Sequence, residues 1–595
     1  MKNRLHHAAG YGMKHYTIGL SVTYHDSALA ILDAEGKVLF AEATERYLQN
    51  KRALNAEPDQ LFRIPELLET YCPDPGEITI ASNWRKQRPL YESIVSRLGL
   101  LSAPGLLKDG IKRLRSPLGN YQLHHMMACQ NNSIRRAGLN LVRILRECHP
   151  QCKVIFANYD HHLTHAAAAC YGSPFEEAAC AVIDSFGEYG AMAFYRYRNG
   201  RLDPLYVARG AGTASLGLYY MKITELCGFD WLKGEEWKVM GLAPYGKLNE
   251  ELYALLQSTI TLDGFEVRHR GKAFFNRIDR LDAFKHKRQD PIEQAADLAC
   301  TGQLFFAETV NRLLSHLQQT TQSGNLALAG GCALNSSNNG RITRQTPFKQ
   351  IYIPSAPADD GCALGAAWLA HHAAHPAISV PNAIQTPYTG SVIADEAVDR
   401  LLRFNRALNI EHLPDKICEA TAARLAAGQL VGWLQGRAEF GPRALGNRSI
   451  LADPRFAETQ DLINENIKFR ETFRPFAPSI LHEFGPDYFE HYQESPYMDK
   501  TLTIREAMRQ RIAAVCHVDG SGRLQTVKKE WNPRFYQLID CFRQLTGIPV
   551  LLNTSFNVMG KPLAHSLEDA IALFLTTGLD VLVVNDYLIS KPRDE

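Results

Sequence analysis

The feature that most constrains the fold is a pattern of short strands that occurs twice in the chain. Near the start, the β-branched strand YTIGLSV (residues 16–22) precedes a second strand in HDSALAIL, the polar turn DAEGK and the strand VLFAEA. After residue 177 the order returns as AACAVI, the loop DSFGEYG, the strand AMAFYRYR, an Asn-Gly turn and RLDPLYVAR. A strand, a polar loop and two strands joined by a tight turn therefore predict an internal duplication.

Such a duplication is typical of the actin and sugar-kinase class of α/β folds, in which the loops after the first strand of each half face one cleft. A helix over 291–319, the strand LALAGG and a strand–loop–helix in IYIPSAPADDGCALGAAWLAHHAA complete this part. Pro and polar residues over 375–389 indicate a linker. We expect an N-terminal extension over 1–15, the duplicated domain over 16–380 and a second α/β domain over 381–595.

Charge and cysteine content narrow the class of protein. The chain has 65 Lys+Arg against 63 Asp+Glu, a formal charge of +2, so no general electrostatic attraction to nucleic acid or an anionic membrane is expected. No apolar stretch approaches the ~18 residues of a membrane helix, and the start has no secretory signal pattern. The 13 cysteines contain no C-x-x-C. We therefore expect a cytoplasmic protein with free thiols.

One candidate site is a metal centre. In DHHLTHAAAA the Ala run predicts a helix, so His161 and His165 project from one face, which is common in half of a metal site. Asp184 follows a strand in AVIDSFGE, and Asp359 follows one in PADDG. Two imidazoles and two carboxylates suit iron(II), manganese or zinc. The alternative is a pair of packing histidines and two turn-capping carboxylates.

Two further loops carry candidate residues. His25, in YHDS after the first strand, is a candidate general base toward a hydroxyl, or a simple turn histidine. Gly330, Gly331 and Asn335 follow the strand LALA, where side-chain-free backbone can approach a nucleotide. No Walker A, Rossmann, HExxH or GxSxG motif is present, which disfavours ordinary NTPases, dehydrogenases, zinc proteases and serine hydrolases.

A basic cluster lies in the second domain, within GWLQGRAEFGPRALGNRSILADPR and NIKFRETFRPFAPSIL. Its members stand among Gly and Pro: Arg437, Arg443, Arg448, Lys468, Arg470 and Arg474. Arg523 and the LLNTSFN segment with Asn553, Ser555 and Asn557 add polar partners. Guanidinium forks on tight turns suit capture of phosphate or carboxylate. The alternatives are a solvated basic face, an ion-pair network or a double-stranded-RNA surface.

Together the motifs resemble those of one enzyme family. HDSALA, DHHLTHAAAA, VIDSFGEYG, GEEWKVMGLAPYG, LAGGCALNSSNNGRI, PSAPADDGCALGAA, FGPRALGNRSILADPR, FRPFAPSIL and PVLLNTSFN are similar, in order, to motifs of the O-carbamoyltransferases. That family includes nodulation-factor, tobramycin and cephalosporin carbamoyltransferases. The resemblance implies an N-terminal domain similar to the tRNA threonylcarbamoyl transferases and a C-terminal YrdC-like α/β domain.

The resemblance also implies a reaction. Carbamoyl phosphate and ATP, with Mg(2+), give carbamoyladenylate in the YrdC-like domain, and the carbamoyl group passes through a channel to a hydroxyl of a natural-product or sugar-like acceptor. The expected ligands of a metal, iron(II) by preference, are His161, His165, Asp184 and Asp359. His25 is expected to be the base, and the nucleotide is expected beside Gly330, Gly331 and Asn335. Carbamoyl phosphate and ATP are expected to bind Arg443, Lys468, Arg474, Arg523 and Ser555.

Three other interpretations remain at this point. A tRNA threonylcarbamoyl enzyme shares both domain types but requires an RNA-binding surface. A hydrogenase-maturation carbamoyltransferase carries CxxC zinc fingers that this chain lacks. A non-enzymatic nucleotide- or RNA-binding protein needs no His/His/Asp/Asp set. The sequence assigns no role to Lys238, does not name the acceptor, and leaves open whether the chain forms a homodimer.

Overall fold

The computed structural model describes residues 14–85, 117–209, 213–271, 273–287, 289–376, 378 and 384–592. The expected extension over 1–15 lies almost wholly outside these ranges, and only its last two residues belong to a strand. Residues 86–116 also lie outside them.

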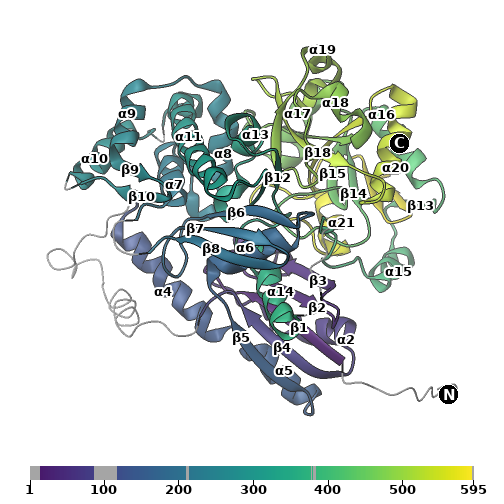
Figure 1. Cartoon of the computed structure of the whole chain (residues 1–595). Coiled ribbons are helices and arrows are strands. Elements are labelled where there is room, and N and C mark those ends of the chain that lie inside the picture. Colours follow the sequence, from purple (N-terminus) through teal and green to yellow (C-terminus); the bar gives the residue numbers. More distant parts are fainter. Residues whose placement is uncertain are drawn as a thin grey trace.

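The first repeat forms a five-stranded sheet in the order β3-β2-β1-β4-β5 (Figure 1). Its strands are β1 (Lys14–Ser21), β2 (Ala28–Leu32), β3 (Val38–Ala43), β4 (Pro75–Ser82) and β5 (Lys153–Asn158). β1, β2 and β3 are antiparallel in turn, whereas β4 runs parallel to β1 and β5 parallel to β4. The described part of this repeat includes the helices α1 (Thr44–Leu48), α2 (Ile64–Tyr71), α4 (Asn120–Arg136) and α5 (Leu139–Cys148).

The second repeat has the same topology, in the order β12-β11-β6-β7-β8. Its strands are β6 (Glu177–Ile183), β7 (Met192–Arg198), β8 (Arg201–Val207), β11 (Asn325–Ala329) and β12 (Gln350–Tyr352). β6, β7 and β8 are antiparallel in turn, and β11 and β12 continue the sheet in parallel from β6. The strand pattern thus repeats element by element, and the predicted duplication is confirmed.

A mainly helical insert lies between β8 and β11. It contains α7 (Leu216–Leu226), α8 (Glu236–Leu242), α9 (Glu250–Thr259), α10 (Phe274–Leu281) and α11 (Ala296–Thr321), with the hairpin β9 (Ile260–Asp263) and β10 (Glu266–His269). α11 is the helix predicted over 291–319, and it starts later because residues 292–295 form a 3-10 turn after Pro291. Buried residues of α7 and α11 join the apolar core of the second sheet.

Two helices pack between the two sheets, at the centre of the molecule (Figure 1). α14 (Cys362–Ala374) lies against β1, β2 and β4, and α6 (His161–Tyr171) lies against β6, β7 and β11. The two helices also contact each other closely, because a Cβ at Gly365 would stand 1.9 Å from the carbonyl oxygen of Thr164. This close approach brings the first turns of α6 and α14 together, and both turns carry candidate site residues.

The second domain is built on a nine-stranded mixed sheet, in the order β13-β21-β20-β14-β15-β19-β16-β18-β17. Its strands are β13 (Asn409–His412), β14 (Val431–Leu434), β15 (Arg448–Ala452), β16 (Ala477–Leu481), β17 (Lys500–Thr503), β18 (Ser521–Val527), β19 (Val550–Ser555), β20 (Val581–Val584) and β21 (Tyr587–Ser590). Its longer helices are α15 (Asp395–Phe404), α16 (Ile417–Ala426), α20 (Pro533–Thr546) and α21 (Leu567–Thr576). This sheet has its own large apolar core.

The domains meet through apolar and backbone contacts. Phe473 of the second domain packs in the core of the second repeat, and Phe440 packs with the core around α6 and α14. At Gly340, which precedes α13 (Ile342–Gln345), a Cβ would stand 1.9 Å from the carbonyl oxygen of Thr501 on β17. Such contacts fix the second domain against the duplicated one.

The predicted fold class is confirmed as an α/β chain with a duplicated domain of actin and sugar-kinase topology, followed by a second α/β domain. The boundary predicted near residue 380 stays a prediction. It falls between α14 and α15, close to residues that the structure does not describe. In the described ranges, no helix combines the length and apolar character needed to cross a membrane.

Candidate active site: two pockets in one cavity

The first pocket starts from the N-terminal turn of α6. Asp160 caps this helix, since its Oδ1 accepts a hydrogen bond from the Leu163 amide at 3.1 Å. His161 and His165 then project from the same face, one turn apart, and both are buried. The sequence prediction of a helix with paired imidazoles is therefore borne out by the local structure.

Two carboxylates reach these imidazoles from different elements. Asp184 directly follows β6, and Asp359 opens the 3-10 turn that leads into α14. The Nε2 atom of His161 lies 3.3 Å from Asp184 Oδ2 and 3.5 Å from Asp359 Oδ1. The Nε2 atom of His165 lies 3.7 Å and 3.4 Å from the same two oxygens. The four ligand atoms thus surround one point between the two sheets.

These distances fit a bound cation. Ligand atoms about 2.1 Å from a common ion stand roughly 3.4 Å apart in a tetrahedral arrangement, and the four measured separations run from 3.3 to 3.7 Å. Among the residues that the structure describes, neither ring nitrogen of His165 has a hydrogen-bond partner, although the residue is only 1% exposed. Buried polar atoms of this kind are normally satisfied. The residues present therefore fit a metal, and they form a candidate metal-binding cluster.

The pKa values of the cluster residues also support a bound cation. Burial lowers the pKa of His161, but hydrogen bonds to Asp184 and Asp359 outweigh burial and raise it to about 10. Burial would raise the pKa of Asp359, yet the two imidazoles hold it well below its usual range. Both carboxylates are therefore ionised and attract positive charge, which a divalent ion would supply in place of imidazolium protons.

His25 stands at the edge of this cluster, in the loop after β1. Its Nδ1 lies 2.9 Å from Asp26 Oδ2 and 3.6 Å from Asp359 Oδ2. Arg52 contacts Asp26 from the other side, with Nη2 3.3 Å from Oδ2. Burial would raise the pKa of Asp26, but Arg52 and His25 lower it to about 2. Asp26 thus stays ionised and orients the His25 ring.

The Gly-rich loop after β11 lies beside the same cluster. The Gly331 amide donates a hydrogen bond to Asp184 Oδ1 at 3.1 Å, so this glycine positions a carboxylate. Gly330 has a φ of 90°, and a Cβ there would stand 2.3 Å from the Ile183 carbonyl oxygen. Gly331 and Asn335 line the neighbouring cavity, whereas Gly330 packs behind it against β6.

The second pocket is cationic. Five of the basic side chains that line the cavity at the second domain come from the segments before β15 and β16 and from β18: Arg443, Lys468, Arg470, Arg474 and Arg523. Among the described residues, no carboxylate oxygen lies within 4.0 Å of Arg443, Arg470 or Arg523. Arg474 has a partner in Glu471, at 3.3 Å. Positive charge therefore exceeds negative charge in this pocket.

Burial and neighbouring like charges lower the pKa values of these side chains. Burial lowers the pKa of Arg443 to about 10, and burial together with neighbouring guanidinium groups holds that of Arg523 well below its usual range. Lys468 is also buried, and its Nζ donates to Asn557 Oδ1 at 2.8 Å and to Ser555 Oγ at 3.3 Å. Such a pocket gains free energy when an anion enters it.

Both pockets open into one cavity of about 1900 Å³. His25, Asp184 and Asp359 line it at the duplicated domain. The five basic residues, Asn553 and Ser555 line it at the second domain. Most of the predicted site residues therefore line one continuous space, whereas His161, His165 and Gly330 lie behind its wall.

Two arginines of the sequence cluster do not line this cavity. Arg448 donates to the carbonyl oxygens of Gln435 and Asn447 at 2.8 and 2.9 Å and to that of Ser391 at 3.1 Å. Arg437 donates to the carbonyl oxygen of Leu39 at 2.7 Å. Both guanidinium groups bind backbone at the junction of the two domains, so their role in this structure is structural.

Lys238 and Trp237, both on α8, were assigned no role from the sequence. Lys238 Nζ lies 2.7 Å from Glu471 Oε1, across the domain interface. The Arg474 guanidinium lies 3.8 Å from the centre of the Trp237 ring. Both residues hold the loop that carries Arg474. The only sequence signal was the motif GEEWKVMGLAPYG, whose contacts depend on the packing of the two domains.

An actin and sugar-kinase-type domain with a His/His/Asp/Asp cluster, joined by one cavity to a cationic α/β domain, defines the class: a two-domain group-transfer enzyme. The family model described as Carbamoyltransferase N-terminus matches residues 114–368, and that described as Carbamoyltransferase C-terminus matches residues 422–591. The chain belongs to the carbamoyltransferase family, and it is a carbamoyltransferase enzyme.

Individual relatives agree with this assignment. Nodulation protein NolO of Bradyrhizobium diazoefficiens is 37% identical over 455 residues, which cover 73% of this chain and 79% of that protein. Nodulation protein NolNO of Sinorhizobium fredii is 39% identical over 454 residues, or 72% of this chain and 63% of that protein. An uncharacterized Synechocystis protein, sll1178, is 32% identical over 618 residues and is covered to 97%, as is this chain.

Proposed function

We propose that the chain is an ATP-dependent O-carbamoyltransferase that works in two steps, one at each end of the shared cavity. In the cationic pocket, water cleaves carbamoyl phosphate to carbamate and phosphate. A carbamate oxygen then attacks the α-phosphorus of ATP, which gives carbamoyladenylate and releases pyrophosphate. The carbamoyl group then passes to a hydroxyl of a small-molecule acceptor beside His25, and AMP leaves. The observation that carries this proposal is the single cavity lined by both sets of residues.

The first step is assigned to the cationic pocket because both co-substrates are polyanions. Arg443, Arg474 and Arg523 provide fixed guanidinium groups that can bind phosphate oxygens in pairs. Lys468 and Ser555 stand together through their hydrogen bond and complete the expected binding set. Mg(2+) accompanies the ATP. Positive charge held in a buried pocket stabilises the charge that develops on the leaving pyrophosphate.

The second step is assigned to His25. Because its Nδ1 contacts Asp26, its Nε2 is the ring nitrogen available to take the proton of the acceptor hydroxyl. The acceptor oxygen then attacks the carbamoyl carbon, and the bond from that carbon to the adenylate oxygen breaks. An ion held by His161, His165, Asp184 and Asp359, which we propose to be iron(II) with manganese or zinc as alternatives, supplies Lewis-acid stabilisation of the developing charge.

The adenylate has a candidate position between the two pockets. Gly331 and Asn335 line the cavity next to Asp184, and neither adds a bulky side chain there. We assign this stretch to the nucleotide moiety of carbamoyladenylate. A closed route between the two ends protects the labile group from hydrolysis.

The acceptor is proposed to be a natural-product or sugar-like alcohol, in a cytoplasmic setting and outside nucleic acid or membrane. The formal charge of +2 supports a small acceptor over RNA. A tRNA threonylcarbamoyl-type enzyme is the second candidate, because it requires the same two domain types.

The test is pyrophosphate release by the purified full chain with ATP and Mg(2+). We expect release only when carbamoyl phosphate is added, with no RNA present. Release that requires tRNA would favour the second candidate, and no release under either condition would contradict the adenylation step. A mass-spectrometric screen of alcohols for carbamoyl addition then identifies the acceptor class.

A further inference from the structure

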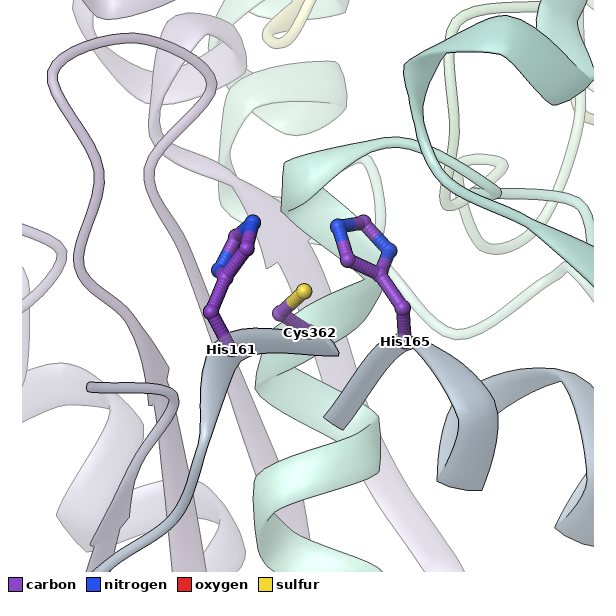
Figure 2. Close-up of side chains that lie close together, drawn as sticks. All are labelled: His161, His165 and Cys362. Carbon is purple, nitrogen blue, oxygen red and sulfur yellow. The ribbon is translucent and has the colours of Figure 1, made fainter. Parts of the chain in front are cut away.

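One cysteine lies against the candidate metal ligands. Cys362 is the first residue of α14, three positions after Asp359, and it is 0% exposed. Figure 2 shows its sulfur between the imidazole rings of His161 and His165. One ligand atom of each of these three residues lies within 4.8 Å of the other two. The same two histidines therefore belong to a second potential ligand set, with sulfur in place of the carboxylates.

The packing of the helices holds the sulfur there. α6 and α14 touch at Gly365 and Thr164, where no side chain fits between the two backbones. Cys362 stands one turn before Gly365, and His165 follows Thr164, so this contact fixes the separation of sulfur and imidazole. His165 itself is buried, and within the described part of the chain neither of its ring nitrogens is hydrogen-bonded; a buried imidazole in that state indicates a missing partner.

We propose that Cys362, as a thiolate, is a further ligand of the ion held by His161 and His165. The thiol loses one proton to solvent as the sulfur–metal bond forms. This inference rests on the metal site proposed above, but it does not depend on carbamoyl chemistry. The ligand set then places sulfur beside two imidazoles, a mixture that favours iron(II), cobalt(II) or zinc.

A sulfur ligand makes this site select a transition metal over Mg(2+). ATP brings Mg(2+) into the same space, and Mg(2+) prefers oxygen ligands in octahedral geometry. Two carboxylates at the cavity wall, Asp184 and Asp359, would accept such an ion. Imidazole and thiolate donors disfavour it, so Cys362 keeps the transfer site for a transition metal while Mg(2+) serves the nucleotide.

The test uses the full chain, freed of metal and loaded with cobalt(II). Thiolate bound to cobalt(II) gives a sulfur-to-metal charge-transfer absorption in the near ultraviolet, whereas imidazole and carboxylate give only the weaker visible bands. Cys362→Ser is the variant, and Cys332→Ser is the matched control, because Cys332 is a thiol that lines the adjoining cavity.

We expect the parent chain and Cys332→Ser to show the charge-transfer absorption. Cys362→Ser should lose it but keep the visible bands, which report an intact site. In competition, Mg(2+) should displace cobalt(II) from Cys362→Ser more readily than from the parent. The Mg(2+) concentration required should be lower by about 10-fold or more, in the range seen when groups that support a metal site are removed.

The proposal is overturned if the cobalt-loaded parent lacks this absorption, if the parent binds no cobalt, or if Cys362→Ser retains the absorption. Should Cys362→Ser fail to fold, a cobalt-loaded parent without the absorption still overturns the proposal. Pyrophosphate release is measured separately. A negative spectrum with normal pyrophosphate release removes the thiolate ligand only, and the reverse result removes the adenylation step only.

Discussion

The two ends of the cavity differ in how far their charges are balanced by neighbouring side chains. At the metal cluster, acids and imidazoles face each other at 3.3 to 3.7 Å, and the charges nearly balance within the protein. At the cationic pocket, like charges are crowded together and only Arg474 has a carboxylate within 4.0 Å among the lining guanidinium groups of the described chain. The first pocket is organised by its own side chains, whereas the second is completed by the anion that it binds.

This difference predicts that the two pockets fail separately. Loss of a cluster residue removes a ligand from a preformed set, so metal content and transfer fall together while adenylation continues. Loss of a guanidinium weakens the capture of anions, so adenylation falls while metal content stays. Each variant below tests this separation, and the expected effects decrease in order.

Asp359→Asn should have the largest effect. It removes one charged ligand, so bound metal should fall well below one ion per chain and carbamoyl transfer by roughly 10³-fold or more. Pyrophosphate release should stay near the parent rate. The matched control is Asp360→Asn, because burial raises the pKa of Asp360 to about 8, so its side chain is already mostly neutral at pH 7. Equal metal loss in both variants would contradict the ligand assignment.

Arg474→Ala should stop adenylation while metal content is unchanged. Removal of one donor to a developing charge costs roughly 10²- to 10³-fold in rate, so pyrophosphate release should fall by that amount. Arg437→Ala is the control, since that guanidinium binds backbone outside the cavity and its loss should lower stability instead. Pyrophosphate release at the parent rate in Arg474→Ala would place the anion elsewhere.

His25→Asn should abolish base catalysis and keep both pockets. We expect transfer to fall by roughly 10²-fold, the lower range for loss of a general base, with carbamoyladenylate formed as in the parent. Product yield and adenylate formation are measured in the same reaction by chromatography. A normal product yield would show that His25 is not the base. A loss of carbamoyladenylate formation would show that His25 acts in the cationic pocket and not beside the metal cluster.

Much of the first pocket was predictable because its signals are local. The strand pattern around VLFAEA and AMAFYRYR follows from hydrophobic alternation and turn residues, and both strands occur as predicted. The spacing of His161 and His165 follows from helix geometry alone. Asp184 and Asp359 were accessible because each follows a strand of a duplicated fold, whose loops converge.

The second pocket was less predictable because its geometry depends on contacts between the domains. Six basic residues of similar sequence context separate into four that line the cavity and two, Arg437 and Arg448, that bind backbone. The loop of Arg443 is placed by Gly441, whose φ is 115° and whose Cβ would stand 2.2 Å from the Ser355 carbonyl oxygen. No local pattern contains that contact.

Lys238 connects the two domains, so its variants test whether the two pockets fail separately. The residue belongs to the duplicated domain, yet it contacts Glu471 beside Arg474. Lys238→Met should therefore lower pyrophosphate release by about 10-fold with no change in metal content, the effect of losing a positioning partner rather than a binding group. Lys238→Arg, which keeps the charge, should restore most of the rate. A loss confined to carbamoyl transfer would show that Lys238 serves the metal pocket instead.

Glu42→Gln should affect both pockets equally and only slightly, which sets the baseline for the selective variants. Glu42 is buried at the domain interface, where its Oε2 accepts a hydrogen bond from the Ser391 hydroxyl at 2.5 Å and its Oε1 lies 3.4 Å from His565. Burial would raise the pKa of Glu42, but His565, Arg63 and Ser391 lower it from 4.5 to about 2. Both half-reactions should therefore fall by the same factor, about two- to threefold.

The lowered pKa of Glu42 makes the contribution of this interface to the free energy of unfolding depend on pH. A carboxyl group whose pKa is depressed on folding stabilises the folded chain fully above its unfolded pKa, and the contribution disappears as the pH falls through the folded pKa. For Glu42 this is roughly 3 kcal/mol, present above about pH 4.5 and lost toward pH 2. Urea unfolding of the parent and Glu42→Gln should differ by that amount at pH 7, and the difference should shrink across this window. A difference that does not change with pH would show that packing, and not the charge of Glu42, joins the two domains at this point.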